Sequence, residues 1–361
     1  MSTRLTAVAM ALAVGALLIL RGAMLLSVAL ASEEGSESGP QWEWVACGVA
    51  ACALVAACDY RRLGRGAGPW VVTGLAALLL AAVLTPWLGL DAKGARRWLR
   101  WGGQPSELGK IALVVGLAAY CAAQQPAMGE RLRGFVYPGL IVGLFVGLVF
   151  LEPDWGTAIL LATVGLAMLF VAGTHWGYLL SGLIIGGEVF LILLCRNPVR
   201  LGRVLALLDS NGSREGVGWQ SWQSVLSMGA GGFWGRGLGE GKQKFGFVPE
   251  QHTDFILSLV GEELGFVGTT VVVLAFLCLA LGGLRIAWRT TDPFGHYLAI
   301  GCTFLLGCQA AMNIGVATSV LPNKGIALPL LSYGGSSLVA MLTCIGLTMS
   351  VALHAGVEDS S

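Results

Sequence analysis

Acidic residues cluster at the start of a long apolar run in the last third of the chain. The stretch VPEQHTDFILSLVGEELGF places Glu250, His252 and Asp254 at the edge of this run, with Glu262 and Glu263 inside it. A carboxylate at membrane depth is costly unless a partner or water stabilises it, so such residues are candidates for function. At the rim of a membrane, a carboxylate could serve as a general acid or base.

The stretch GARRWLRWGGQPSELGK (94–110) combines basic and aromatic residues with the start of a helix. Arg97 and Trp98 lie in its first half, and its PSE triplet is typical of a helix N-terminus. Glu107 and Lys110 are three positions apart, so they can pair on one helix face. The cluster could bind an anion, or it could be an interfacial anchor with a structural ion pair.

Two shorter stretches also bring polar residues to the ends of apolar runs. In LEPDWGTA, Asp154 is expected to cap the helix that follows. In LPNKGIALPLLSYGGSS, prolines and paired glycines interrupt helical structure and leave Lys324 reachable, with Ser336 near the end. Irregular backbone at that depth is tolerated only where it lines protein or water.

A glycine-rich stretch, GAGGFWGRGLGEGKQK, precedes the acidic cluster. Its glycines could cradle a phosphate, but the stretch matches neither a phosphate-binding loop nor a dinucleotide fingerprint. Arg236 stands where the first loop glycine would be needed, and Gln243 replaces the required serine or threonine. A nucleotide site is therefore not expected.

The composition is that of a polytopic membrane protein. Of 361 residues, 55% are hydrophobic and 12% are charged, with a mean hydropathy of +0.75. The 53 glycines suit close helix packing in lipid. The net charge of +1 does not point to nucleic acid, and none is expected as a partner. The nine cysteines lie almost entirely in apolar runs without CxxC spacing, so neither a disulfide framework nor a zinc site is expected.

Ten apolar runs are long enough to cross a bilayer. They cover approximately residues 5–30, 43–59, 70–90, 106–123, 134–151, 156–173, 177–195, 255–284, 296–318 and 330–353. We therefore expect an all-α integral membrane protein with about ten transmembrane helices, forming a single polytopic domain over residues 1–361. A large extracytoplasmic loop is expected at 196–254, between the seventh and eighth helices. An even number of spans places both termini on one side.

Charge alone leaves the orientation open. With a cytoplasmic N-terminus, eight basic residues would lie inside and thirteen outside, against the positive-inside rule. The outside residues, however, stand in glycine-rich motifs with tryptophan and carboxylates, as in an anion site. The N-terminal run with ALAS at 29–32 also resembles a cleavable signal peptide, although its length and Arg21 favour a retained span.

Because the polar clusters fall in alternate loops, they are expected to surround one cavity at one face of the membrane. A polyprenyl diphosphate sugar would suit it, with the diphosphate against basic side chains. Glycosyl transfer needs a base for the acceptor hydroxyl proton and positive charge for the departing diphosphate. Asp254 is the natural base. His252 could orient it or hold substrate, or could be a structural residue.

The motifs together resemble those of the SEDS family (shape, elongation, division and sporulation), over nearly the whole chain. They are GARRW with QPSELGK, EPDWGTA, GWQSWQSVLSMGAGGFWGRGLGEGKQK, PEQHTDFILSLVGEELGF and NIGVATSVLPNKGIALPLLSYGGSS. LPNKG and GEELGF look more like the division-type FtsW branch than the elongation-type RodA branch. The resemblance implies a peptidoglycan glycosyltransferase that polymerises lipid II on the outer face of the cytoplasmic membrane, with both termini inside.

The resemblance also implies roles for individual residues. The family's essential aspartate falls on Asp254, and its acid and lysine pair falls on Glu107 and Lys110. Arg97 and Lys324 match its arginine before tryptophan and its last-loop lysine. Further substrate contacts are expected at Trp98, Glu250, His252 and Ser336. The expected partners are lipid II, a class B penicillin-binding protein and other division proteins. No ligand spacing specifies a metal, although a divalent cation could help neutralise the diphosphate.

Two departures from the family concern loop geometry. The stretch between Trp98 and Gln104 is shorter than expected, and Ser319 replaces a usual glycine. Three functions stay open: polymerase, flippase for the same precursor, and non-catalytic division scaffold. A flippase predicts charges along the whole transmembrane path, whereas here Glu188 is the main mid-span exception. About 12 Å of helix separates Glu262 from Asp254, so Glu262 and Glu263 are expected to brace neighbouring helices.

Overall fold

The ten predicted apolar runs all form helices in the computed structural model. The structure describes residues 3–31, 41–92, 95–100, 102–208, 218–241, 254–323 and 325–355. Within these ranges, seven helices are long and apolar enough to cross a membrane, and three shorter helices are also apolar. The predicted fold class, an all-α multi-pass membrane protein, is confirmed.

The long helices include α1 (Thr3–Ala31), α5 (Pro105–Ala123), α6 (Tyr137–Leu151), α8 (Trp176–Cys195), α11 (Ile256–Arg289), α12 (Pro293–Ala317) and α13 (Gly335–His354). A π-helical turn, η2 (Arg131–Val136), leads directly into α6. The shorter apolar helices are α2 (Trp42–Ala57), α4 (Gly68–Val83) and α7 (Trp155–Val171).

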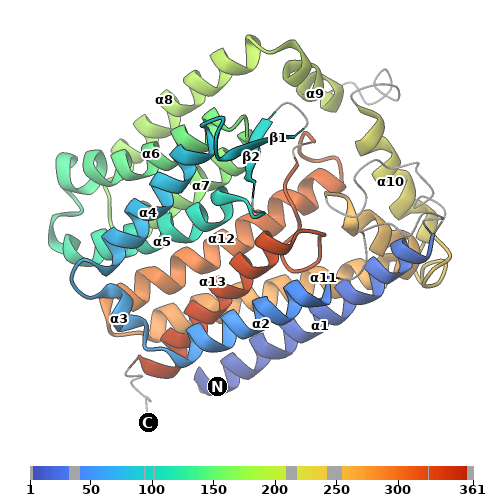
Figure 1. Cartoon of the computed structure of the whole chain (residues 1–361), viewed down its shortest axis with the longest axis horizontal. Coiled ribbons are helices and arrows are strands. Elements are labelled where there is room, and N and C mark those ends of the chain that lie inside the picture. Colours follow the sequence, from blue (N-terminus) through green and yellow to red (C-terminus); the bar gives the residue numbers. More distant parts are fainter. Residues whose placement is uncertain are drawn as a thin grey trace.

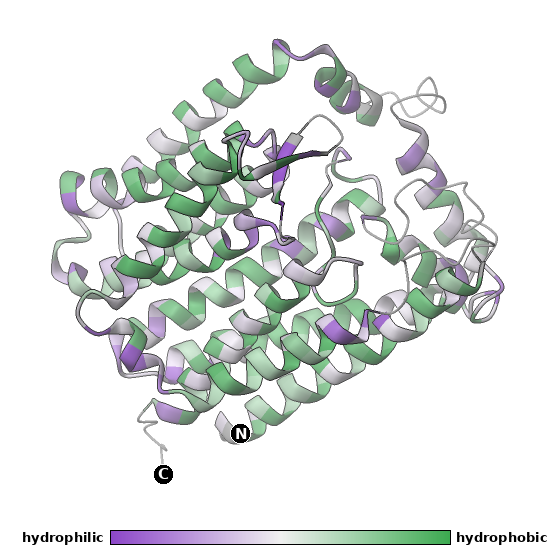
Figure 2. Cartoon of the chain, in the orientation of Figure 1, coloured by the Kyte–Doolittle hydropathy of each residue, from purple (hydrophilic) through white to green (hydrophobic). Residues whose placement is uncertain are grey.

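Helix α12 lies in the middle of the bundle and packs against α5, α7, α11 and α13 (Figure 1). The start of α1 and the end of α13 lie at the same end of the bundle, next to the short helix α3 (Tyr60–Gly64). The opposite end carries α9 (Pro198–Leu208) and α10 (Trp219–Gly231). Apolar residues cover the lengths of the helices, and hydrophilic residues gather mainly at both ends (Figure 2).

Three local details differ from the sequence predictions. The stretch around GARRW forms a small antiparallel strand pair that was not predicted, β1 (Gly89–Ala92) with β2 (Ala95–Leu99). The span predicted to reach residue 90 ends with α4 at Val83, just before a turn that contains Pro86. The span predicted from residue 330 begins only with α13 at Gly335, because residues 330–334 form turns. Where the loop 196–254 is described, it contains two helices, α9 and α10.

Helix α11 is kinked at Gly265, whose backbone takes a φ of 67°. At the kink, carbonyls before Gly265 and amides after it bond outside their own helix. The glycine-rich segment that precedes α11 in the sequence supplies their hydrogen-bond partners. The amides of Arg236 and Gly237 donate to the carbonyls of Glu262 and Glu263, each at 3.0 Å. The amides of Phe266 and Val267 donate in turn to the carbonyls of Gly232 and Phe233, at 2.9 and 3.2 Å. In a membrane such groups must be paired within the protein.

The glycines of GAGGFWGRG therefore allow the backbone of this segment to lie directly against the backbone of α11. A Cβ atom on Gly265 would overlap the backbone of Phe233 and Gly235, and one on Gly231 would overlap the backbone of Gly261. Only glycine permits this approach together with the left-handed conformation at position 265.

We expect Gly265→Ala to lower the apparent melting temperature of the detergent-solubilised protein by several degrees. A backbone with φ of 67° and ψ of −161° lies in a region almost restricted to glycine and costs another residue about 1–3 kcal/mol. The overlap with the 233–235 backbone adds to this cost. The matched control is Gly307→Ala in α12, where an added methyl group meets nothing within 4 Å. Equal melting temperatures for the two variants would contradict this account of the kink.

Candidate active site

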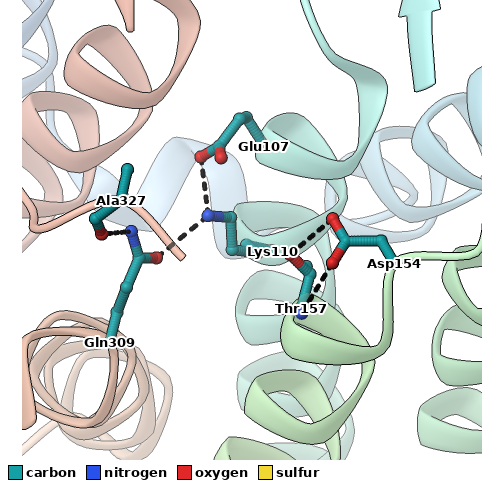
Figure 3. A network of polar contacts seen from close by, with 6 residues as sticks. All are labelled: Glu107, Lys110, Asp154, Thr157, Gln309 and Ala327. Carbon is teal, nitrogen blue, oxygen red and sulfur yellow. Dashed lines mark hydrogen bonds and ion pairs between the residues drawn. The ribbon is translucent and has the colours of Figure 1, made fainter. Parts of the chain in front are cut away.

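A buried lysine lies near the start of α5. The Nζ atom of Lys110 is 2.7 Å from Oε2 of Glu107 and donates a 2.9 Å hydrogen bond to Oε1 of Gln309 (Figure 3). Lys110 is only 2% exposed and Glu107 only 8%. The predicted pairing of these two residues is confirmed. A buried ion pair needs further hydrogen bonds to remain stable, and Gln309 supplies one.

Two amide side chains of α12 hold the loop before α13. Gln309 donates a 3.0 Å bond to the carbonyl of Ala327, and Asn313 donates a 2.7 Å bond to the carbonyl of Ile326. Four residues apart, they lie on one face of the helix. The same Nδ2 of Asn313 also donates to the backbone carbonyl of Asp254, at 2.8 Å. Asn313 thereby joins the start of α11 to residues 325–334, the part of the last loop that directly precedes α13.

Arg21 of α1 holds the far end of this loop. The guanidinium is buried, donates through Nη1 to the carbonyl of Ser332, and donates through Nη2 to Oε1 of Gln41 at 3.0 Å. The Ser332 hydroxyl accepts a 2.7 Å bond from the amide of Leu328. Helices α1 and α12 together thus fix residues 325–334 as a structured part of the protein.

Asp254 is half-buried at the start of α11. Its carboxylate lies against the last loop, because a Cβ atom added to Gly325 would be 3.1 Å from Oδ2. The predicted base therefore lies beside the residue that follows Lys324. Lys324 itself, together with Glu250 and His252, lies outside the described residues.

Helix α10 is tied to the same end of α12. The hydroxyl of Ser224 donates a 2.7 Å bond to the carbonyl of Ala317, and that of Ser319 donates a 3.1 Å bond to the carbonyl of Ser221. Ser319 has a φ of 57°, in the left-handed region that favours glycine. This backbone geometry explains why a glycine would suit the position where this chain has serine.

Arg97 of β2 holds the turn between α6 and α7. Its Nε donates to the carbonyl of Glu152 at 3.0 Å, and its Nη2 donates to that of Pro153 at 2.7 Å. Asp154 caps α7, accepting bonds from the amide and hydroxyl of Thr157 at 3.1 and 2.9 Å (Figure 3). The predicted cap is confirmed.

Glu152 was not singled out from the sequence, because its environment depends on the folded turn. The side chain is fully buried, and neither carboxyl oxygen has a hydrogen-bond partner among the described residues. Burial, followed by the nearby Asp154 carboxylate, raises the pKa of Glu152 to about 8, although Arg97 acts in the opposite direction. Glu152 is therefore mainly protonated at neutral pH.

The two acids of GEELGF are structural braces, as expected. Oε1 of Glu262 forms a 3.0 Å ion pair with Arg236. Glu263 accepts a 2.6 Å bond from the hydroxyl of Ser27 in α1 and a 3.0 Å bond from the amide of Gly239. Both glutamates are completely buried. They join α1, α11 and the glycine-rich segment behind the kink.

The structure thus connects Glu107, Lys110 and Asp254 through two α12 amides and the last loop. Trp98 is 40% exposed on β2, and Ser336 is half-buried in the first turn of α13. The described part of the chain contains no group of three or more His, Cys, Asp or Glu side chains that could hold a metal ion.

Comparison with known proteins assigns the family. A family model described as cell cycle protein, covering FtsW, RodA and SpoVE, matches residues 2–356. The chain belongs to this family, the SEDS family. Among curated relatives, the chain is 41% identical over 296 residues to the probable peptidoglycan glycosyltransferase FtsW of Trichlorobacter lovleyi, covering 81% of this chain and 77% of the relative. The protein of the same name from Geobacter metallireducens is 43% identical over 308 residues, with 84% and 81% covered.

Solved structures of the SEDS family share this fold. One chain of a peptidoglycan synthase complex, solved to describe how that complex coordinates polymerization and crosslinking, superposes with a TM-score of 0.80 at 28% identity, covering 95% of this chain and 96% of the other. RodA of Thermus thermophilus gives a TM-score of 0.70 at 28% identity, with 96% of each chain covered. The FtsW names of the curated relatives agree with the predicted division-type branch.

The raised pKa of Glu152 makes stability depend on pH. Between the ordinary value of 4.5 and the folded-state value of about 8, the folded protein keeps a proton that the unfolded chain has lost. Stability contributed by the protonated carboxyl is therefore complete below pH 4.5 and is lost as the pH rises through about 8, at about 1.4 kcal/mol per pH unit. A glutamine at position 152 does not titrate, so the Glu152→Gln variant should not lose this stability. We therefore expect the difference in melting temperature, variant minus wild type, to grow from pH 5 to pH 8.

The control for this series is Glu130→Gln, which removes an exposed carboxylate 3.9 Å from Arg133. Its melting temperature should track wild type at every pH. A constant offset between Glu152→Gln and wild type would show that Glu152 does not titrate in this range.

Proposed function

We propose that this chain is a peptidoglycan glycosyltransferase that polymerises lipid II during cell division, with Asp254 as the general base. The observation that carries the proposal is the position of the Asp254 carboxylate against the last loop, beside the residue after Lys324. Asn313 holds the backbone of Asp254 and of this loop at once. The carboxylate of the proposed base therefore lies where α11 begins, against the loop that precedes α13.

The proposed reaction assigns one role to each of these groups. A sugar hydroxyl of one lipid-linked disaccharide attacks the anomeric carbon of another, forming a glycosidic bond while the bond to the polyprenyl diphosphate breaks. Asp254 takes the hydroxyl proton, and the negative charge leaves with the diphosphate. Lys324 and Arg97 supply the positive charge that stabilises it.

The remaining predicted residues have supporting roles in this proposal. Lys110 and Glu107 are buried and act through Gln309, which fixes the last loop. Glu250, His252, Trp98 and Ser336 remain candidates for contacts with the sugars or the diphosphate.

Orientation and partner are part of the proposal. Both termini lie in the cytoplasm, so the end that carries Asp254 faces outward, where the disaccharide of lipid II would be polymerised. A class B penicillin-binding protein is the proposed partner, because a structural relative is part of a complex that coordinates polymerization and crosslinking. Such a partner would crosslink the strands that this chain makes, alongside other division proteins.

Replacing the proposed base tests the mechanism directly. We expect Asp254→Asn to lower lipid II polymerisation by the purified protein and its partner about 100-fold or more, in the range by which general bases accelerate reactions. Glycan strands formed from labelled lipid II are measured on gels.

The matched control is Asp59→Asn at the opposite end of the bundle, where an asparagine can keep the helix cap that Asp59 provides. Its polymerisation rate should equal that of wild type. Wild-type rates from Asp254→Asn would exclude it as the base and favour a scaffold. Transport of lipid II across vesicles without glycan formation would favour a flippase.

Removing the amide that joins Asp254 to the last loop should also slow the reaction. Asn313→Ala leaves the carbonyls of Asp254 and Ile326 without their amide donor. We expect polymerisation to fall about tenfold or more, because small displacements of catalytic groups have large effects on rate. Initial rates at saturating lipid II measure this change.

Thr318→Ala serves as the control, since among the described residues the Thr318 hydroxyl bonds only to carbonyls of its own helix, Ile314 and Gly315. Melting temperatures of both variants separate loss of fold from loss of rate. An Asn313→Ala protein with an unchanged rate would show that this amide does not position the base.

A further inference from the structure

Glu188 is a carboxyl residue inside an apolar span that the proposed reaction does not use. It lies in α8, twelve residues after Trp176 and seven before Cys195. At 1.5 Å per residue these separations correspond to about 18 and 10 Å along the helix. Glu188 therefore lies within the depth of the hydrocarbon core.

The side chain points away from the bundle. Helix α8 lies at its edge (Figure 1) and contacts it through one side. There the ring of Phe190 lies 5.5 Å from that of Trp155, and Gly182 faces the ring of Phe135. With 100° between successive residues, Glu188 is 160° from Phe190 and 120° from Gly182 around the helix. The side chain of Glu188 is exposed, in agreement with this direction.

No described residue of the protein compensates the carboxyl group of Glu188. Within the described part of the chain, no hydrogen bond or ion pair involves Glu188. The nearest arginine along the helix is Arg196, about 12 Å further on. A charged residue that faces lipid near the centre of a helix is energetically unfavourable. A partner in the membrane would remove this cost.

The residues around Glu188 form a seam suited to another helix. Ser181, Ile184, Glu188, Leu191 and Cys195 follow one another at intervals of three and four residues, and all are exposed. This is the spacing of the contact positions in left-handed helix pairs, where one polar residue specifies partner and register. We call these five residues the α8 seam.

We propose that the α8 seam is the docking surface for a transmembrane helix of another protein, one that places a basic side chain at the depth of Glu188. The complementary charge neutralises the carboxylate, and the flanking apolar residues pack against the partner helix. A symmetric pair of two copies of this chain would instead bring two Glu188 carboxyls together without a cation. The proposal does not depend on the role of Asp254.

Designed helices test the proposal with the full chain in phosphatidylcholine vesicles. One probe is a leucine–alanine transmembrane peptide with a single lysine at the matching depth, and the matched probe has leucine there. Energy transfer between a fluorophore on the peptide and one on a C-terminal tag measures binding. We expect the lysine probe to bind wild type about tenfold more tightly than it binds Glu188→Leu, because the variant loses an interhelical polar contact. The leucine probe should bind both proteins equally weakly.

A charge exchange and two bulky variants complete the test. The Glu188→Lys protein should no longer bind the lysine probe, because the two charges repel. It should instead bind a probe that has glutamate at the same position. Ile184→Trp should weaken binding of the lysine probe, whereas Val189→Trp, which is exposed but 100° from Glu188, should not. Equal binding of the lysine probe to wild type and Glu188→Leu would overturn the proposal, and so would self-association of the chain that requires Glu188 and excludes the probe.

Discussion

In the core of a bilayer, a backbone carbonyl that lacks a hydrogen-bond donor from the protein cannot bond to water instead. The last loop leaves helical geometry just where the proposed reaction takes place, so its carbonyls must be paired within the protein. Gln309 and Asn313 pair those of Ala327 and Ile326, and Arg21 pairs that of Ser332. The position of Asp254 depends on the same hydrogen bonds, because the Asn313 amide that pairs the Ile326 carbonyl also donates to the carbonyl of Asp254.

Much of the architecture could be predicted from hydropathy and local spacing. All ten spans, the Glu107–Lys110 pair and the Asp154 cap follow from interactions between residues close in sequence. The strand pair was missed because its stability depends on packing beside α4 and α5. Asn313 and Glu152 were missed for a related reason: their importance arises from contacts or burial that only the folded chain creates.

A glycine-rich segment can serve either to bind phosphate or to let two backbones pack closely together. Its glycines would suit phosphate binding, yet in the structure they let the 231–237 backbone pair with the kinked part of α11. The buried Glu262 and Glu263 belong to the same arrangement, since they bind Arg236 and Gly239 of this segment. Acids inside an apolar run can thus stabilise the scaffold, while the proposed base, Asp254, lies at the edge of the run.

The bond between Arg21 and Ser332 joins residues 311 positions apart in the chain. At about 5–20 residues per second, a ribosome needs about 15–60 s to make the segment between them. During that interval the Arg21 guanidinium of α1 is already in or near the bilayer, but the Ser332 carbonyl that accepts its hydrogen bond has not yet been synthesised. Helix α1 therefore reaches its final environment only after Ser332 has been synthesised, so the packing of this helix is among the late steps in the assembly of the membrane domain.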